Sequence, residues 1–150
     1  MLTFPVAELL AEDAVLVREA RKATTLSYAP YSKYRVGAAV LLAGGEIVRG
    51  ANQENSSYPC GICAERSVLA TAQNLHPDVP VVAIALAATT QSAAPTSFTD
   101  TPVTPCGMCR QVIAEAEQRY GASIRIIMTS NTDAVIVSTV KELLPLAFGE

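Results

Sequence analysis

Four cysteines and one glutamate are the residues of this chain best suited to carry chemistry. Cys60 and Cys63 stand in "PCGICAER", and Cys106 and Cys109 stand in "TPCGMCRQ". Two Cys-x-x-Cys pairs are typical of zinc sites, and four thiolates would close the coordination shell of a structural zinc ion. Three thiolates would leave one position for water, whose pKa falls from 15.7 to about 7 on zinc. Glu65, two residues after Cys63, is then a candidate catalytic acid or base.

The spacing of the cysteines separates these two alternatives only in part. Between the two pairs lie 42 residues, whereas compact zinc ribbons have about 15–20 residues between theirs. Cys106 and Cys109 share one face of a predicted helix start, and Cys63 begins another predicted helix, where free amides favour thiolates. Cys60 lies in the preceding turn and need not point the same way. Regular helix geometry would turn Glu65 away from Cys63, so spacing alone does not direct its carboxyl group at a metal.

The elements that must position these residues alternate between helices and strands. Helical periodicity, apolar runs and turn signals define them. The expected order is helix 5–26, hairpin strands 35–42 and 46–51, helix 63–75, strand 79–88, polar loop 90–102, helix 106–121, strands 123–130 and 133–139, and a short helix 140–148. This order predicts one α/β domain over residues 1–150, a three-layer α/β/α sandwich with a mixed central sheet of about five strands.

Composition narrows the class of partner. The chain has 150 residues, 50% hydrophobic and 17% charged, with a net charge of −3. An acidic chain argues against a nucleic-acid partner, and we expect the basic cluster of Arg18, Arg21 and Lys22 to be the solvated side of a helix. A mean hydropathy of +0.29 favours a homo-oligomer. We expect no membrane span and no signal peptide, and therefore a cytoplasmic protein whose thiols stay reduced.

Some titratable residues have simple structural interpretations. His76 precedes a proline and is expected to end a helix, not to bind metal. Glu115 and Glu117 are expected on a solvated helix face and not to form an acid–base pair.

Taken together, the motifs resemble those of the zinc-dependent cytidine deaminases, in the homotetrameric type with three cysteine ligands. The handful of residues in "CAER" and "PCGMCRQ" carry most of the likeness. "SYAPYSKYRVGAAVLL", "GANQENSSYP" and "ELLPLAFG" occur in the order and spacing of that family. The sequence departs from the family pattern at Cys60, in a longer 90–102 loop, and in the short stretch that follows Phe148.

The resemblance implies that Cys63, Cys106 and Cys109 bind one Zn²⁺ per chain and that Glu65 carries protons. Arg66 is implied to offset the charge of the three thiolates. Further contacts with substrate are implied as follows: Asn52 and Glu54 with the ribose hydroxyls, Tyr34 with the base, the backbone of Ala64 and Thr104 with the pyrimidine edge, and Tyr58 and Phe148 across subunit boundaries.

The activity implied is hydrolysis of cytidine and 2'-deoxycytidine to uridine and 2'-deoxyuridine with release of ammonia, a step of pyrimidine salvage. The partner is then a small nucleoside, bound in pockets shared between subunits of a homotetramer. Three alternatives stay open: a deaminase of another cytosine-like nucleoside such as an antibiotic, a structural four-cysteine zinc module, and a thiol–disulfide oxidoreductase. Replacing Cys60 by Ser distinguishes the deaminase from the closed zinc module.

Overall fold

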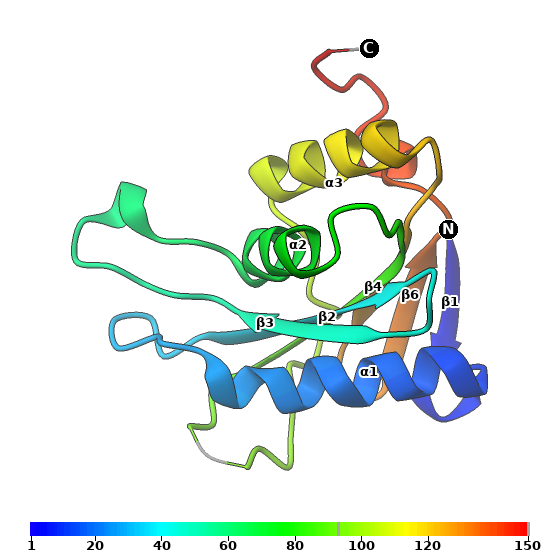
Figure 1. Cartoon of the computed structure of the whole chain (residues 1–150). Helices are drawn as coiled ribbons and strands as arrows, with labels where there is room; N and C mark the ends of the chain where they lie inside the picture. The colour runs from blue at the N-terminus through cyan, green and yellow to red at the C-terminus, as the bar shows by residue number, and fades with distance from the viewer. Residues whose placement is uncertain (93, 150) are drawn as a thin grey trace.

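The computed structural model describes residues 1–92 and 94–149. One mixed sheet has helix α1 on one face and helices α2 and α3 on the other (Figure 1). The helices are α1 (Ala11–Ala23), α2 (Ala64–Leu75) and α3 (Gly107–Tyr120). The strands are β1 (Leu2–Pro5), β2 (Arg35–Leu42), β3 (Ile47–Ala51), β4 (Val81–Thr89), β5 (Arg125–Thr129) and β6 (Asp133–Val137). The expected three-layer α/β/α sandwich is confirmed.

The sheet has six strands in the order β1-β6-β5-β4-β2-β3, one more than the sequence predicts. Among the described strands of this sheet, only the central pair, β4 and β5, is parallel, because α3 connects them by a crossover across one face. The β2–β3 hairpin and the β6–β1 pair extend the sheet in antiparallel fashion on either side. The sheet is therefore mixed, as expected, with a parallel pair near the middle.

The extra strand comes from the N-terminal segment, where the expected helix over 5–26 is wrong in its first turns. Residues 2–5 pair with β6, and Val6–Glu8 form a 3₁₀ turn that we label η1. Val6 and Leu9 still pack on the α1 side of the sheet, so a 3₁₀ turn produced the apolar spacing that indicated a helix. Leu10 is extended and 78% exposed, and α1 begins only after it.

Two separate cores lie on the two faces of the sheet, and β4 contributes to both. Its large residues Ile84 and Leu86 face α2 and α3, whereas Ala83, Ala85 and Ala87 face α1. This follows from the two-residue side-chain period of a strand. The small side chains under α1 allow its backbone to approach the sheet closely, and the large ones pack under α2 and α3.

Gly37 in β2 marks the closest approach of α1 to the sheet. A Cβ atom there would lie 2.5 Å from the backbone nitrogen of Thr24 and closer still to the carbonyl oxygen of Ala20. Because backbone atoms cannot move aside cheaply, we expect Gly37→Ala to lower the free energy of unfolding by about 3 kcal/mol. The melting temperature should fall by roughly 5–10 °C.

Gly44→Ala is the matched control for this change, because its added methyl meets only the flexible end of the Glu46 side chain. Thermal unfolding of the two variants measures the difference. Equal melting temperatures for both variants would contradict the close packing of α1 on β2.

Glu117 holds the end of α3 to the segments that follow it, and the expectation that it lies on a solvated face is wrong. Its Oε1 accepts hydrogen bonds from the backbone nitrogens of Ile124 (2.8 Å) and Val140 (3.0 Å). Its Oε2 accepts one from the hydroxyl of Thr139 at 2.8 Å. The carboxylate is buried and satisfied, which is the usual condition for a buried charge. Glu115 is exposed, as expected.

The C-terminal segment contains only a 3₁₀ turn, η4 (Val140–Glu142), where the sequence predicts a short helix over 140–148. Pro145 interrupts that stretch and lacks the amide that a longer helix would need. Across the described residues, no helix combines the length and the apolar character required to cross a membrane.

Candidate metal centre and active site

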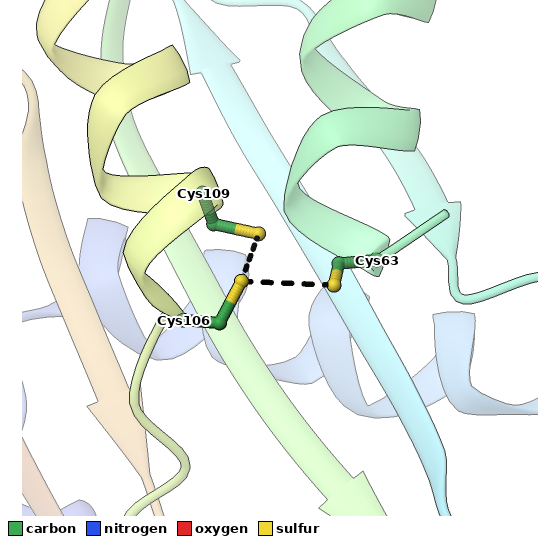
Figure 2. Close-up of side chains that lie close together, drawn as sticks. All are labelled: Cys63, Cys106 and Cys109. Atoms are coloured by element: carbon green, nitrogen blue, oxygen red, sulfur yellow. Dashed lines mark hydrogen bonds between the residues drawn. The ribbon is translucent and has the colours of Figure 1, made fainter. Parts of the chain in front are cut away.

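Three of the four cysteines meet where two helices begin. Cys63 is the residue before the first turn of α2, Cys106 occupies the same position before α3, and Cys109 lies in the first turn of α3. Their sulfur atoms point toward one another (Figure 2). The sulfur of Cys106 lies 3.9 Å from that of Cys63 and 3.3 Å from that of Cys109. All three sulfurs lie within 4.8 Å of one another.

This arrangement fits a zinc ion. Tetrahedral coordination with Zn–S bonds of about 2.3 Å requires sulfur atoms about 3.8 Å apart, close to the separations found. Free backbone amides at the helix starts favour thiolates. The neighbouring Cys109 is the main influence that lowers the pKa of the Cys63 thiol to about 6. The same contact raises the pKa of Cys109. The contacts within the cluster therefore favour loss of the proton from Cys63.

Cys60 does not join this group. It lies in a 3₁₀ turn, η3 (Tyr58–Cys60), on the segment that projects beyond the sheet between β3 and α2 (Figure 1). Its side chain is exposed, and among the described residues the cluster that could hold a metal contains only Cys63, Cys106 and Cys109. The geometry therefore favours three thiolate ligands over the closed four-cysteine site.

Glu65 lies beside the three thiols, although regular helix geometry alone does not place it there. Because Cys63 precedes the helix and is extended, Glu65 occupies the second helical position and turns inward. Only 4% of the residue is exposed. Burial is the main cause that raises its pKa to about 7, and the charge of Cys63 adds to it. A carboxyl group that titrates near neutral pH is suited to take up and release protons.

Arg66 lies at the same helix start as Cys63, close enough for its charge to act on that thiol. Its Nη2 donates to the carbonyl oxygen of Gly61 at 3.2 Å. Its positive charge is one of the influences that lower the pKa of Cys63. The Nε atom is buried and has no hydrogen-bond partner among the described residues. An unpartnered buried donor fits an environment that becomes anionic when three thiolates hold a metal.

The thiols and Glu65 form the floor of a cleft of about 700 Å³. The structure brings most of the residues expected at the site to this cleft. Those lining it are Tyr34, Asn52, Glu54, Tyr58, Cys63, Ala64, Glu65, Arg66, Thr104 and Cys106. Cys109 is buried beneath it. Phe148 is not part of the lining: it is 88% exposed, and its backbone is tethered to α3 through the side chain of Gln111.

A short backbone pairing fixes the segment that carries the cleft wall. Gln53 and Ile62 exchange two backbone hydrogen bonds of 3.0 Å, so the chain returns to the sheet just before Cys63. The backbone nitrogen of Glu54 donates to the carbonyl oxygen of Tyr28 at 2.8 Å. These contacts join the wall to the start of α2.

The side chain of Asn52 makes most of its possible hydrogen bonds to other residues of the chain. Its Oδ1 accepts from the hydroxyl of Ser27 (2.5 Å) and the backbone nitrogen of Val36 (2.9 Å). Its Nδ2 donates to the carbonyl oxygen of Tyr34 at 2.9 Å, which leaves one N–H of the amide. Asn52 therefore holds β2 to the cleft wall, and it has a single donor left for a ligand.

Glu54 is held by the turn that precedes β2. Its Oε2 accepts from the backbone nitrogens of Tyr31 (2.9 Å) and Ser32 (3.3 Å), and its Oε1 accepts from the hydroxyl of Ser32. The hydrogen bond from Ser32 is the main cause that lowers the pKa of Glu54, so the group is a carboxylate at neutral pH. The remaining lone pairs of a fixed carboxylate are well suited to accept hydrogen bonds from hydroxyl groups.

Aromatic side chains form the mouth of the cleft. Tyr34 is 38% exposed, and its pKa is raised by burial and by the charge of Glu65. Tyr31 and Tyr58 make an edge-to-face contact with ring centroids 6.5 Å apart. Tyr58 is nonetheless 79% exposed. The opening is therefore apolar and incompletely covered within one chain.

Sequence reasoning missed several residues that line the cleft. Tyr31, Ser32, Gln53 and Met108 all do so. The tyrosine-rich "YAPYSKY" was a signal of aromatic packing for Tyr31. Nothing in the local sequence indicated that Ser32 would bond to Glu54, because the two residues are brought together only by the hairpin and the Gln53–Ile62 pairing.

Three cysteine thiols that could hold a metal, a buried carboxyl group beside them and an open cleft are the arrangement expected of a zinc-dependent hydrolase. The family model for the cytidine and deoxycytidylate deaminase zinc-binding region matches residues 10–121, and the chain belongs to this family.

Named relatives agree with this assignment. The chain is 41% identical to a cytidine deaminase of Halalkalibacterium halodurans, over 89% of this chain and 92% of that protein. It is 38% identical to a cytidine deaminase of Sporosarcina psychrophila, over 90% of each. The crystal structure of cytidine deaminase from Burkholderia pseudomallei superposes with a TM-score of 0.75 at 33% identity, over 90% of this chain and 98% of that one.

Proposed function

We propose that this protein is a zinc-dependent cytidine deaminase, which hydrolyses cytidine and 2'-deoxycytidine to the corresponding uridines and ammonia. The observation that carries the proposal is the buried carboxyl group of Glu65 beside the group of Cys63, Cys106 and Cys109, at the floor of an open cleft. A purely structural zinc site has no use for an ionisable group buried in this way.

The three thiolates would hold the metal and Glu65 would move the protons. When bound, zinc supplies a Lewis acid that lowers the pKa of water to about 7. Glu65 would take a proton from the attacking water and deliver it to N3 of the cytosine ring as the water oxygen adds to C4. A second proton transfer through Glu65 converts the amino group into ammonia, the C4–N bond breaks, and the carbonyl group of uracil forms. A carboxyl pKa near 7 suits both directions of transfer.

The sugar would bind on the opposite wall of the cleft. The carboxylate of Glu54 is fixed by the turn at Tyr31 and Ser32 and accepts hydrogen bonds from ribose hydroxyls. The spare N–H of Asn52 donates to one of the same hydroxyls. Tyr34 packs on the base, and the backbone of Ala64 and Thr104 faces the polar edge of the pyrimidine.

The direct test measures zinc content and deamination together. Zinc-loaded protein is mixed with cytidine, deoxycytidine, cytosine, a cytosine-like antibiotic nucleoside and adenosine, and the conversion is followed by ultraviolet absorbance and ammonia release. We expect turnover of cytidine and deoxycytidine and little turnover of adenosine. Turnover of the antibiotic alone would favour the alternative substrate class. Zinc binding without any turnover would reject the enzyme.

We also propose that the active protein is a homotetramer in which neighbouring subunits complete each cleft. Tyr58 and Phe148 are 79% and 88% exposed, and Met108 and Leu146 are 62% and 92% exposed. Large exposed apolar side chains are typical of surfaces that another chain covers, and two of these, Tyr58 and Met108, line the cleft itself.

Truncation of Phe148 tests the sharing of the cleft. We expect Phe148→Ala to raise KM by about tenfold with a smaller change in kcat, because a buried aromatic contact with substrate contributes about 1.5 kcal/mol. Leu10→Ala, which truncates an exposed residue on the α1 side of the sheet, should leave KM unchanged. Steady-state kinetics and light scattering measure the two effects. An unchanged KM for Phe148→Ala in an intact oligomer would count against the shared cleft.

The cellular setting follows from the thiol chemistry. All four cysteines are free, and three of them must stay reduced to bind metal. We therefore infer a cytoplasmic protein that acts in pyrimidine salvage. We further infer that residues 1–150 form one domain, because both cores pack against the same sheet.

A further inference from the structure

A second cavity, of about 570 Å³, lies on the α1 side of the sheet, on the opposite face from the cysteines. Three of the basic side chains that line it come from α1: Arg18, Arg21 and Lys22. A fourth, Arg49, comes from β3, and Phe98 of the 90–102 loop forms an apolar wall. This basic cavity contains the cluster that the sequence led us to expect on a solvated helix face.

The basic cavity carries an excess of positive charge. Among the described residues, the carboxylate that forms ion pairs with its cations is Glu19, which pairs with Lys22 (2.7 Å) and with Arg49 (3.6 Å). Four cations are thus offset by one anion, although the whole chain has a net charge of −3. Within the part of the chain that the structure describes, no ion pair involves Arg18 or Arg21. The local field therefore favours an anionic ligand.

Arg21 is held rigidly in the wall of the cavity. Its Nη2 donates to the carbonyl oxygens of Ser130 (2.9 Å) and Asn131 (3.1 Å). Its guanidinium carbon lies 4.6 Å from the centre of the Phe98 ring. Its Nε is buried and has no hydrogen-bond partner among the described residues, which leaves Nη1 as the donor for a ligand. A guanidinium fixed in this way loses little conformational entropy when it meets an oxyanion.

The 90–102 loop closes one side of the basic cavity. The hydroxyl of Thr89 donates to the carbonyl oxygen of Ser97 (2.9 Å), and Gln91 bonds to both Ser97 (2.9 Å) and Thr96 (2.8 Å). These hydrogen bonds hold the loop in the conformation that places Phe98 against Arg21. The loop lies on the α1 side of the sheet (Figure 1). Residue 93 lies outside the described residues. The loop that departs from the family pattern thus contributes to this cavity.

We propose that the basic cavity binds a small polyanion that carries two or more phosphate groups. A net excess of three positive charges, spread over α1 and β3, matches several phosphates better than a single one. Arginine guanidinium groups are suited to bind phosphate oxygens through paired N–H donors. Because Arg21 already covers the face of Phe98, recognition rests on the phosphates and not on stacking of a base.

Calorimetric titration with inorganic tripolyphosphate tests this site. At about 50 mM salt, where charges are weakly screened, we expect one site per chain and weaker binding as salt is raised. The double variant Arg18→Gln/Arg49→Gln should lose about tenfold or more in affinity. The matched control, Lys33→Gln/Arg119→Gln, removes the same charge outside the cavity and should retain wild-type affinity. No binding, or an equal loss in both double variants, would overturn the proposal.

A parallel titration with cytidine triphosphate distinguishes the possible sources of the phosphates. Equal affinity for tripolyphosphate and the nucleotide would show that the site binds the phosphates alone. Tighter nucleotide binding that is lost in Arg18→Gln/Arg49→Gln would support the site and add a contact with the nucleoside. Nucleotide binding that survives in this variant and is displaced by uridine would lie in the catalytic cleft and would contradict the proposal. None of these results depends on deaminase activity.

Discussion

Glu65→Gln should reduce kcat for cytidine by about 10³-fold while the protein keeps one zinc ion per chain. Glutamine has nearly the same shape as glutamate but cannot take up a proton. Glu65 lies beside the thiols but is not part of the group that could hold the metal. The absorbance assay gives kcat, and elemental analysis of the dialysed protein gives zinc content. Glu115→Gln is the matched control, because it makes the same change at an exposed position of α3 and should leave kcat unaltered.

The metal-free protein offers a second measurement on the same variant. Burial raises the pKa of Glu65 from 4.5 to about 7, so the unfolded chain loses this proton at a lower pH than the folded chain. The carboxyl group therefore destabilises the fold increasingly as pH rises from about 4.5 to 7. Metal-free Glu65→Gln should melt at a higher temperature than metal-free wild type at pH 8, with a smaller gain at pH 5. Retained turnover together with unaltered melting would disprove the role given to Glu65.

Cys106→Ser should abolish deamination because it removes one of three protein ligands from the metal. The binding free energy of zinc held by four ligands is about 10–16 kcal/mol. Loss of one thiolate should therefore cost about 3 kcal/mol of this binding free energy, which lowers the affinity for zinc by a factor of at least 10². We expect the dialysed variant to retain far less than one zinc ion per chain. Without the shared metal ion, the starts of α2 and α3 are no longer joined. The melting temperature of the zinc-treated variant should therefore be lower than that of the zinc-treated wild type.

Cys60→Ser is the control for this ligand variant, since both residues are exposed cysteines in Cys-x-x-Cys pairs. It should keep its zinc, its kcat and its melting temperature, because Cys60 lies outside the sulfur cluster. Competition with a chelator of known affinity measures the zinc affinity of the wild type, Cys106→Ser and Cys60→Ser. Loss of metal in Cys60→Ser would revive the closed four-cysteine module and remove the open position on which catalysis depends.

The strands and the cysteine cluster were the most predictable parts of the molecule. The β2 and β3 strands follow from two apolar runs on either side of "AGG", and their ends agree with the expected ranges within one residue. Cys63, Cys106 and Cys109 converge because two helices begin at the same end of the sheet, which the α/β order already implied. The orientation of Glu65 was not predictable, because it depends on Cys63 being extended before the helix.

Contacts between distant segments were the least predictable. Leu2–Pro5 is too short and too close to a proline to indicate a strand, and it becomes one only by pairing with β6. Glu117 falls among charged residues on a helix, and its partners Ile124, Thr139 and Val140 arrive from later segments. The hydrogen bond between Ser32 and Glu54 was not predictable either, because it joins two segments that are distant in the sequence. Local pattern carries no information on such pairs.

The alanine-lined face of β4 has a consequence for saturation mutagenesis of this chain. Ala83, Ala85 and Ala87 leave no volume for added methyl groups beneath α1, so a selection for folded protein should deplete even the conservative Val codon at each of them. Ile84 and Leu86, on the other face of the same strand, should accept exchange among branched aliphatics. Along this strand, odd-numbered positions should therefore reject larger apolar side chains and even-numbered positions should accept them, although all are hydrophobic.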